Sequence, residues 1–179
     1  MALLTFGPDQ AMCEVLTFRE GLLSPVAHDL LLRATAFQVT VDPALPALSV
    51  EIDASSLRVV TAMREGQPLP GALRPSDAGE IEATIAGQVL RASHFPVIRF
   101  ASASVSRTDA GYDVRGQLTI AGGTRDVSLT VTRAAGRLAT EVRIHQPDYG
   151  IRPYRAMLGT LRVKPDVVVR AAIPAEGLP

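Results

Sequence analysis

The fold is decided by two runs of alternating apolar and polar side chains around a pair of glycines: YDVRGQLTI (112–120), AGGTR (121–125) and DVSLTV (126–131). Apolar side chains at every second position are typical of a β-strand that buries one face. Gly122 and Gly123 lie between the two runs, and glycine accepts the positive φ angles of a tight turn. We therefore predict an antiparallel β-hairpin joined at the glycines.

A single hairpin cannot bury its apolar face, so the remainder of the chain must supply further strands. The same alternation predicts strands over 12–18, 29–41, 48–53, 97–105, 138–144 and 167–173, with a turn over 21–27. Together with the hairpin these give about eight strands, and an antiparallel sheet of that size can close into a barrel. We predict an all-β fold, an eight-stranded antiparallel lipocalin-like barrel formed by one domain over residues 1–179.

Two segments depart from the strand pattern. Residues 61–75 contain several prolines and glycines and are predicted to form a loop. Ile81, Ile85 and Val89 then recur every four residues, which places them on one face of a helix. We predict one amphipathic helix over 77–91, with Ser76 or Asp77 as its N-cap and Glu80 as the partner of Asp77 in a capping pair.

Composition and charge limit the classes of partner. Hydrophobic residues make up 47% of the chain and aromatic residues only 4%, with no tryptophan, so aliphatic side chains must fill the core. Eighteen basic residues balance 18 acidic ones, which leaves no net charge to attract a nucleic acid. No apolar run is long enough to span a membrane.

The N-terminal segment suggests a compartment, whereas the cysteine count excludes only an intramolecular disulfide. Cys13 has no second cysteine with which to form an intramolecular disulfide. The first nine residues have no basic region, and Pro8 and Asp9 interrupt their apolar run, which is unlike a secretory leader. We therefore expect a cytoplasmic protein.

The sequence contains no motif that indicates catalysis. No serine lies in a Gly-x-Ser-x-Gly motif, and the glycine pair is not followed by the residues of a phosphate-binding loop. His28, His94 and His145 are far apart in the sequence, so a shared metal site would require their strands to converge inside a barrel. We predict hydrogen-bonded or surface histidines, and no metal or cofactor.

The order of these elements and four local motifs resemble the YceI family of polyisoprenoid-binding, lipocalin-like proteins. The motifs are SPVAHD (24–29), FPVIRFAS (95–102), GQLTIAGGTR (116–125) and DYGI (148–151). The resemblance spans roughly residues 12–173. It departs from the family pattern at residues 88–94, which lack the usual Arg-Asp-x-His-Leu run, and in the absence of a visible secretory leader, since many relatives are periplasmic.

The resemblance implies a barrel closed at one end by a helix, with an apolar tunnel that takes an isoprenoid or fatty chain. The residues themselves agree with this, because many small aliphatic side chains facing inward would underfill an eight-stranded barrel, although they also fit a narrow, collapsed one. We predict that five side chains face the interior: Phe37, Phe100, Leu118, Ile120 and Leu129. At the mouth we predict contacts to a ligand head group from His28, Arg152, Tyr154 and Arg155, since these lie at strand starts and loops.

Three functions are consistent with the sequence. The first is a non-catalytic carrier for a long apolar ligand such as an isoprenoid, a quinone or a fatty acid. The second is an enzyme that acts on such a ligand with the His28–Asp29 neighbourhood as its base. The third is a protein-interaction barrel that uses the loop over 61–75. A homodimer stays open in each case.

Overall fold

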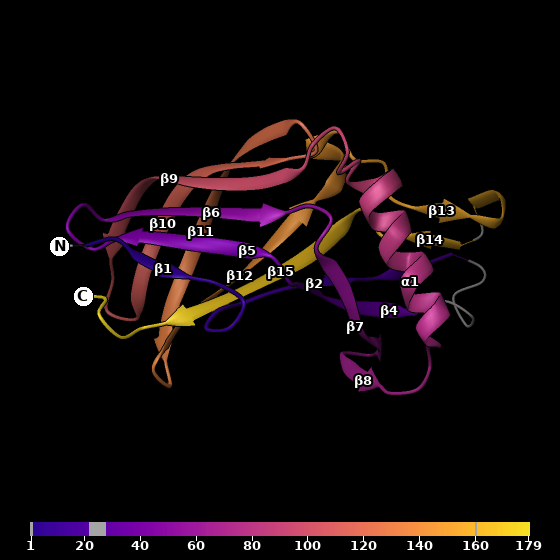
Figure 1. Cartoon of the computed structure of the whole chain (residues 1–179), viewed down its shortest axis with the longest axis horizontal. Helices are drawn as coiled ribbons and strands as arrows, with labels where there is room; N and C mark the ends of the chain where they lie inside the picture. The colour runs from indigo at the N-terminus through magenta and orange to yellow at the C-terminus, as the bar shows by residue number, and fades with distance from the viewer. Residues whose placement is uncertain (1, 22–27, 160) are drawn as a thin grey trace.

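The fold consists of a large curled sheet, a small three-stranded sheet and one helix across one end of the large sheet (Figure 1). The computed structural model describes residues 2–21, 28–159 and 161–179. The strands of the large sheet are β1 (Leu4–Phe6), β2 (Met12–Thr17), β4 (Asp29–Ala34), β5 (Phe37–Asp42), β6 (Ala47–Asp53), β7 (Leu57–Arg64), β8 (Gln67–Leu69), β9 (Val97–Arg107), β10 (Gly111–Ile120), β11 (Gly123–Ala134), β12 (Arg137–His145) and β15 (Asp166–Pro174). Those of the small sheet are β3 (Arg19–Glu20), β13 (Arg155–Ala156) and β14 (Leu161–Val163).

The large sheet is antiparallel and curls without closing. Its strand order is β1-β5-β6-β9-β10-β11-β12-β15-β2-β4-β7-β8, so β1 and β8 are its two edges. The prediction of an antiparallel β fold with one helix is confirmed, but the predicted count of eight strands is wrong. The described residues form fifteen strands in two sheets, and the large sheet is a half-barrel.

The extra strands have two sources. The predicted strand over 29–41 is broken at Thr35 and Ala36 into β4 and β5, which pair with different neighbours. Other strands, such as β1 and β8, are three residues long and too short to show a period of two. The turn predicted over 21–27 lies, apart from Gly21, outside the described residues.

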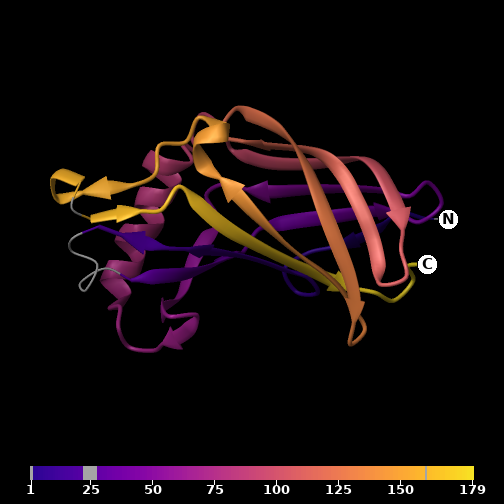
Figure 2. The same cartoon turned by 180° about the vertical axis from the view of Figure 1, so that it is seen from behind.

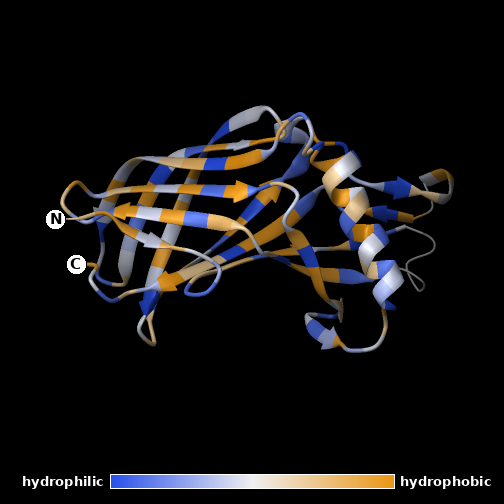
Figure 3. Cartoon of the chain, viewed as in Figure 1, coloured by the Kyte–Doolittle hydropathy of each residue, from blue (hydrophilic) through white to orange (hydrophobic). Residues whose placement is uncertain are grey.

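The decisive hairpin is confirmed. β10 and β11 pair from Gly111 opposite Thr132 to Ile120 opposite Gly123. The two turn residues are Ala121 and Gly122, with φ angles of 47° and 83°, so the turn lies one residue earlier than the glycine pair suggested. Both positive angles are those required by the two-residue turns that fit the twist of a hairpin. Figure 3 shows the alternation of hydrophobic and hydrophilic residues along the strands.

The helix begins earlier than predicted and changes its winding. The α-helix α1 runs over Pro75–Thr84 and continues as a π-helical turn, η2, over Ile85–Val89. Its N-cap is Arg74 rather than Ser76 or Asp77, because Pro75 is well suited to the first helical position. The Asp77 carboxylate accepts hydrogen bonds from the backbone N–H of Arg74 (3.2 Å) and from its guanidinium Nη2 (2.9 Å), so Arg74 takes the partner role expected of Glu80.

The segment predicted as a loop over 61–75 is mostly ordered as a hairpin. β7 extends to Arg64 and pairs with β8, with Met63 opposite Pro68. Pro68 is tolerated because β8 is an edge strand, where a missing N–H breaks no ladder. The Glu82 side chain of α1 then accepts a hydrogen bond from the Val59 backbone N–H (2.9 Å), which fixes the helix to β7.

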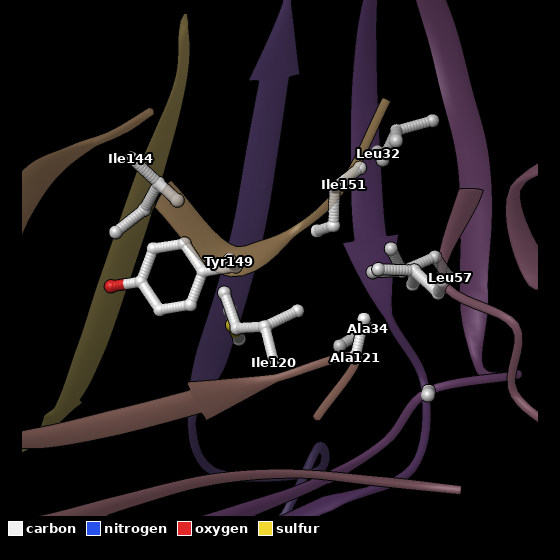
Figure 4. Close-up of a cluster of buried hydrophobic side chains, with 11 residues drawn as sticks. Leu32, Ala34, Leu57, Ile120, Ala121, Ile144, Tyr149 and Ile151 are labelled. Carbon is white, nitrogen blue, oxygen red and sulfur yellow. The ribbon is translucent and has the colours of Figure 1, made fainter. Parts of the chain in front are cut away.

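A main hydrophobic core lies near the end of the curled sheet that α1 covers. Its buried members include Leu32, Leu57, Ile120, Ile144 and Tyr149, and Figure 4 shows the Tyr149 ring near Ile120 and Ile144. Tyr149 comes from a short 3₁₀ helix, η3 (Gln146–Tyr149), which follows β12. In the described residues, no helix has the length and hydrophobicity to cross a bilayer.

Candidate functional site

The concave side of the large sheet encloses an apolar cavity of about 650 Å³. The hairpin supplies one wall through the alternating residues of the predicted buried face: Tyr112, Val114, Leu118 and Ile120 of β10, and Val127, Leu129 and Val131 of β11. Leu30, Leu32, Val167 and Val169 are among the residues from other strands that line it. The inward faces of the sheet thus leave space between them, as expected where aliphatic side chains replace aromatic ones.

The cavity extends along the length of the molecule. At one end it is lined by Ile81, Ile85 and Val89, which form the apolar face of the helix. At the other end it reaches Pro43 and Leu178, near the chain termini on the left of Figure 1. The space is therefore elongated, and a long chain fits it better than a compact ligand.

Polar side chains gather at the α1 end of the cavity. Those that line it include Arg19, His28, Asp77, Glu80, Tyr154 and Arg162. The Arg162 side chain is 42% exposed and forms an ion pair with Glu20, whose Oε1 lies 3.7 Å from Nε. The Nε atom itself is buried and has no hydrogen-bond partner among the described residues. A buried N–H donor without a hydrogen-bond acceptor is uncommon in proteins. This end of the cavity, which we call the mouth, therefore suits a ligand oxygen.

Of the four residues predicted at the mouth, two line the cavity and two do not. His28 and Tyr154 line the cavity, whereas the lining residues in the described part of the chain do not include Arg152 or Arg155. Arg155 lies on β13 directly opposite Arg162 of β14 and is exposed. Arg162 was not among the predicted residues, because β14 is a three-residue strand in which no periodicity is visible.

Four of the five residues predicted in the interior line the cavity: Phe100, Leu118, Ile120 and Leu129. Phe37, at the start of β5, packs against both hydrophobic clusters of the protein instead. Phe37 begins a new strand, β5, opposite Ile52.

The cavity contains one cysteine, and its environment disfavours nucleophilic chemistry. Cys13 lines the cavity and is buried. Burial, and secondarily the negative charge of Glu14, raises the pKa of the Cys13 thiol to about 11. The thiolate is the reactive form of cysteine, so this side chain is almost wholly protonated at neutral pH.

The histidines do not share a site. His28 lies at the mouth, His94 contacts Ser93 and Phe95, and His145 on β12 bonds to the Asp166 carboxylate at the start of β15. In residues 2–21, 28–159 and 161–179, no group of three His, Cys, Asp or Glu side chains is placed to hold a metal ion. Asp29, next to His28, accepts a hydrogen bond from the Arg19 backbone N–H (2.8 Å).

A curled antiparallel sheet around an apolar cavity, with a helix across one end, is typical of lipocalin-like β proteins. Residues 26–175 match the YceI-like domain family, and the chain belongs to this family. A comparison with curated proteins finds no match.

Two solved structures share the fold. BcnA from Burkholderia cenocepacia is 17% identical with a TM-score of 0.59, and the match covers 91% of this chain and 94% of that one. A polyisoprenoid binding domain from Saccharophagus degradans, described as implicated in plant cell wall breakdown, is 14% identical with a TM-score of 0.61, and the match covers 96% of both chains. At these identities the likeness concerns the fold.

Proposed function

We propose that this protein is a non-catalytic carrier that holds one long apolar ligand, an isoprenoid, a quinone or a fatty acid, in the cavity. The observation that carries this proposal is the elongated cavity of about 650 Å³ with an aliphatic lining. Its volume lies within the range of about 300–1,000 Å³ that is usual for small-molecule sites. The description of the Saccharophagus domain as polyisoprenoid-binding supports the same class of ligand.

The hydrophobic effect supplies the affinity. A hydrocarbon chain that enters the cavity removes apolar surface from water, which is favourable by about 25 cal/mol per Å². Val114, Leu118 and Leu129 present only hydrocarbon to such a chain. This recognition is insensitive to branching and unsaturation, so the cavity itself selects for length and apolarity.

The mouth orients the ligand through its polar head. Arg162 Nε lacks an acceptor among the described residues, and a carbonyl, carboxylate or phosphate oxygen would supply one. His28 and Tyr154 line the same end of the cavity and add two groups able to donate hydrogen bonds. Arg152 and Arg155 are exposed and do not line the cavity, so they contribute at most positive charge near the mouth.

Titration with a fluorescent polyene fatty acid tests this proposal. We expect saturable binding with one site per chain, and several-fold weaker binding in an Arg162→Gln variant, because a neutral amide replaces the positively charged donor. Arg155→Gln is the matched control, since Arg155 lies opposite Arg162 on the small sheet but outside the cavity lining. A protein that binds no such probe contradicts the proposal, and equal weakening by both substitutions contradicts the role of Arg162.

A further inference from the structure

The wall of the large sheet is split between β11 and β12. The two strands pair only over four residue pairs, from Val131 opposite Thr140 to Ala134 opposite Arg137. Beyond Val131 and Thr140 they diverge, and Figure 2 shows them separating from the hairpin that joins them. Along the split, each strand is paired on its other side, β11 with β10 and β12 with β15, so neither can shift to close the split without breaking backbone hydrogen bonds to that neighbour.

The split has two defined ends. At the narrow end the Thr140 hydroxyl donates a hydrogen bond to the Thr130 carbonyl (2.9 Å). At the wide end η3 fills the space, because the backbone of Tyr149 lies directly against Gly123 at the start of β11. We call the region between these ends the window.

The window contains a pocket of about 460 Å³ that shares part of its lining with the main cavity. Val127 of β11 and Val142 and Ile144 of β12 line both spaces. The outer rim is polar and includes Ser128, Arg143 and His145. Across the thickness of the wall, the lining of the window thus changes from polar side chains at the rim to aliphatic side chains that also line the cavity.

The contacts of the rim charges do not tie the two strands together. Arg143 and His145 of β12 both pair with Asp166 of β15. Arg125 of β11 donates a hydrogen bond to the carbonyl of its neighbour Thr124 (2.7 Å). In the described part of the chain, no ion pair crosses from β11 to β12. Widening the window thus breaks no backbone hydrogen bonds between β11 and β12. Separating two strands that are paired along their whole length would break several.

We propose that the window is a second, lateral opening through which the apolar ligand enters and leaves the cavity. This inference rests on the proposed carrier function. The mouth is the less accessible route, because the hydrogen bond between the Val59 backbone N–H and the Glu82 side chain holds α1 in place beside it. The hydrocarbon chain slides between Val127 and Ile144, while its head group stays in contact with the polar rim until it is inside.

A cross-link over the window tests the inference. Ser128→Cys and Arg143→Cys place thiols on opposite sides of the window, both exposed and both lining its pocket. Thr132→Cys and Ala139→Cys form the matched control, since these exposed residues are direct partners where β11 and β12 are already paired. Both pairs are made in a Cys13→Ala background, loaded with the fluorescent polyene fatty acid, and joined by the shortest bis-maleimide that bridges each pair.

The readout is the rate of probe release into excess oleate, before and after bridging. We expect release to slow by at least about tenfold when the window is bridged, and to change less than about twofold when the control pair is bridged. Equal release rates with and without the window bridge overturn the lateral opening while leaving the carrier function intact. Failure of the unbridged variants and of the wild-type protein to bind the probe overturns the carrier function, and the lateral opening with it.

Discussion

Gly123 of β11 packs against the backbone of Tyr149, and a Cβ atom on Gly123 would lie 2.7 Å from the Tyr149 Cα and 2.8 Å from its carbonyl oxygen. Because these are backbone atoms, they cannot rotate away from an added methyl group. We predict that Gly123→Ala lowers the free energy of unfolding by about 1–3 kcal/mol, the usual cost of overpacking. Urea denaturation measures this change, and a stability equal to that of the wild-type protein would show that η3 is not fixed against β11.

A glycine in the helix provides the opposite case. A Cβ atom added to Gly79 of α1 would have no neighbouring atom within 4 Å, and the φ angle of Gly79 is not positive. We predict that Gly79→Ala raises the free energy of unfolding by about 0.5–1 kcal/mol, because alanine has the higher helix propensity. The same denaturation experiment checks the sign, and a loss of stability would contradict the described helix.

A large side chain inside the cavity should exclude the ligand. Leu118 of β10 lines the cavity, whereas its neighbour Gln117 is exposed on the outer face. We predict that Leu118→Trp weakens binding of the fluorescent fatty acid by at least about tenfold, which corresponds to about 1.4 kcal/mol. Gln117→Trp should leave the affinity unchanged. If the two substitutions have the same effect, the ligand lies outside the cavity.

Cys13 should make stability depend on pH in alkaline solution. Its thiol pKa is raised from 9.0 to about 11 in the folded protein, so the folded state holds the proton more tightly than the unfolded chain. The stabilisation is fully present below pH 9 and is lost as the pH rises towards 11, with a total change of about 2–3 kcal/mol.

The Cys13→Ala variant separates this effect from other alkaline titrations. Unfolding free energies of both proteins, measured between pH 8 and 11 at steps of about one pH unit, should fall more steeply for the wild-type protein. Parallel profiles would contradict the raised pKa of the thiol.

Local patterns predicted the hairpin well, because the side chains of residues 112–131 follow a period of two over strands long enough to display it. The apolar face of the helix was also visible, since Ile81, Ile85 and Val89 recur every four residues and line the cavity. The π-helical turn at Ile85–Val89 left no such signal, because its side chains still fall on the same face.

The remaining features depend on pairing between distant segments. Pro68 indicated a loop, but its position on an edge strand makes it compatible with β8, and edge positions cannot be read from local sequence. Arg162 reaches the mouth only because β14 pairs with β3, residues far apart in the chain. The window exists because the pairing of β11 with β12 ends at Val131 and Thr140. The alternation of side chains within either strand does not determine where that pairing ends.

The most direct test of the carrier function is organic extraction of the purified protein followed by mass spectrometry, with Leu118→Trp extracted in parallel. We predict that the wild-type extract contains an isoprenoid, quinone or fatty acid in near-stoichiometric amount and that the extract of the variant is depleted of it. A wild-type extract with no such molecule, from a protein that also fails to bind the fluorescent fatty acid, would contradict the account.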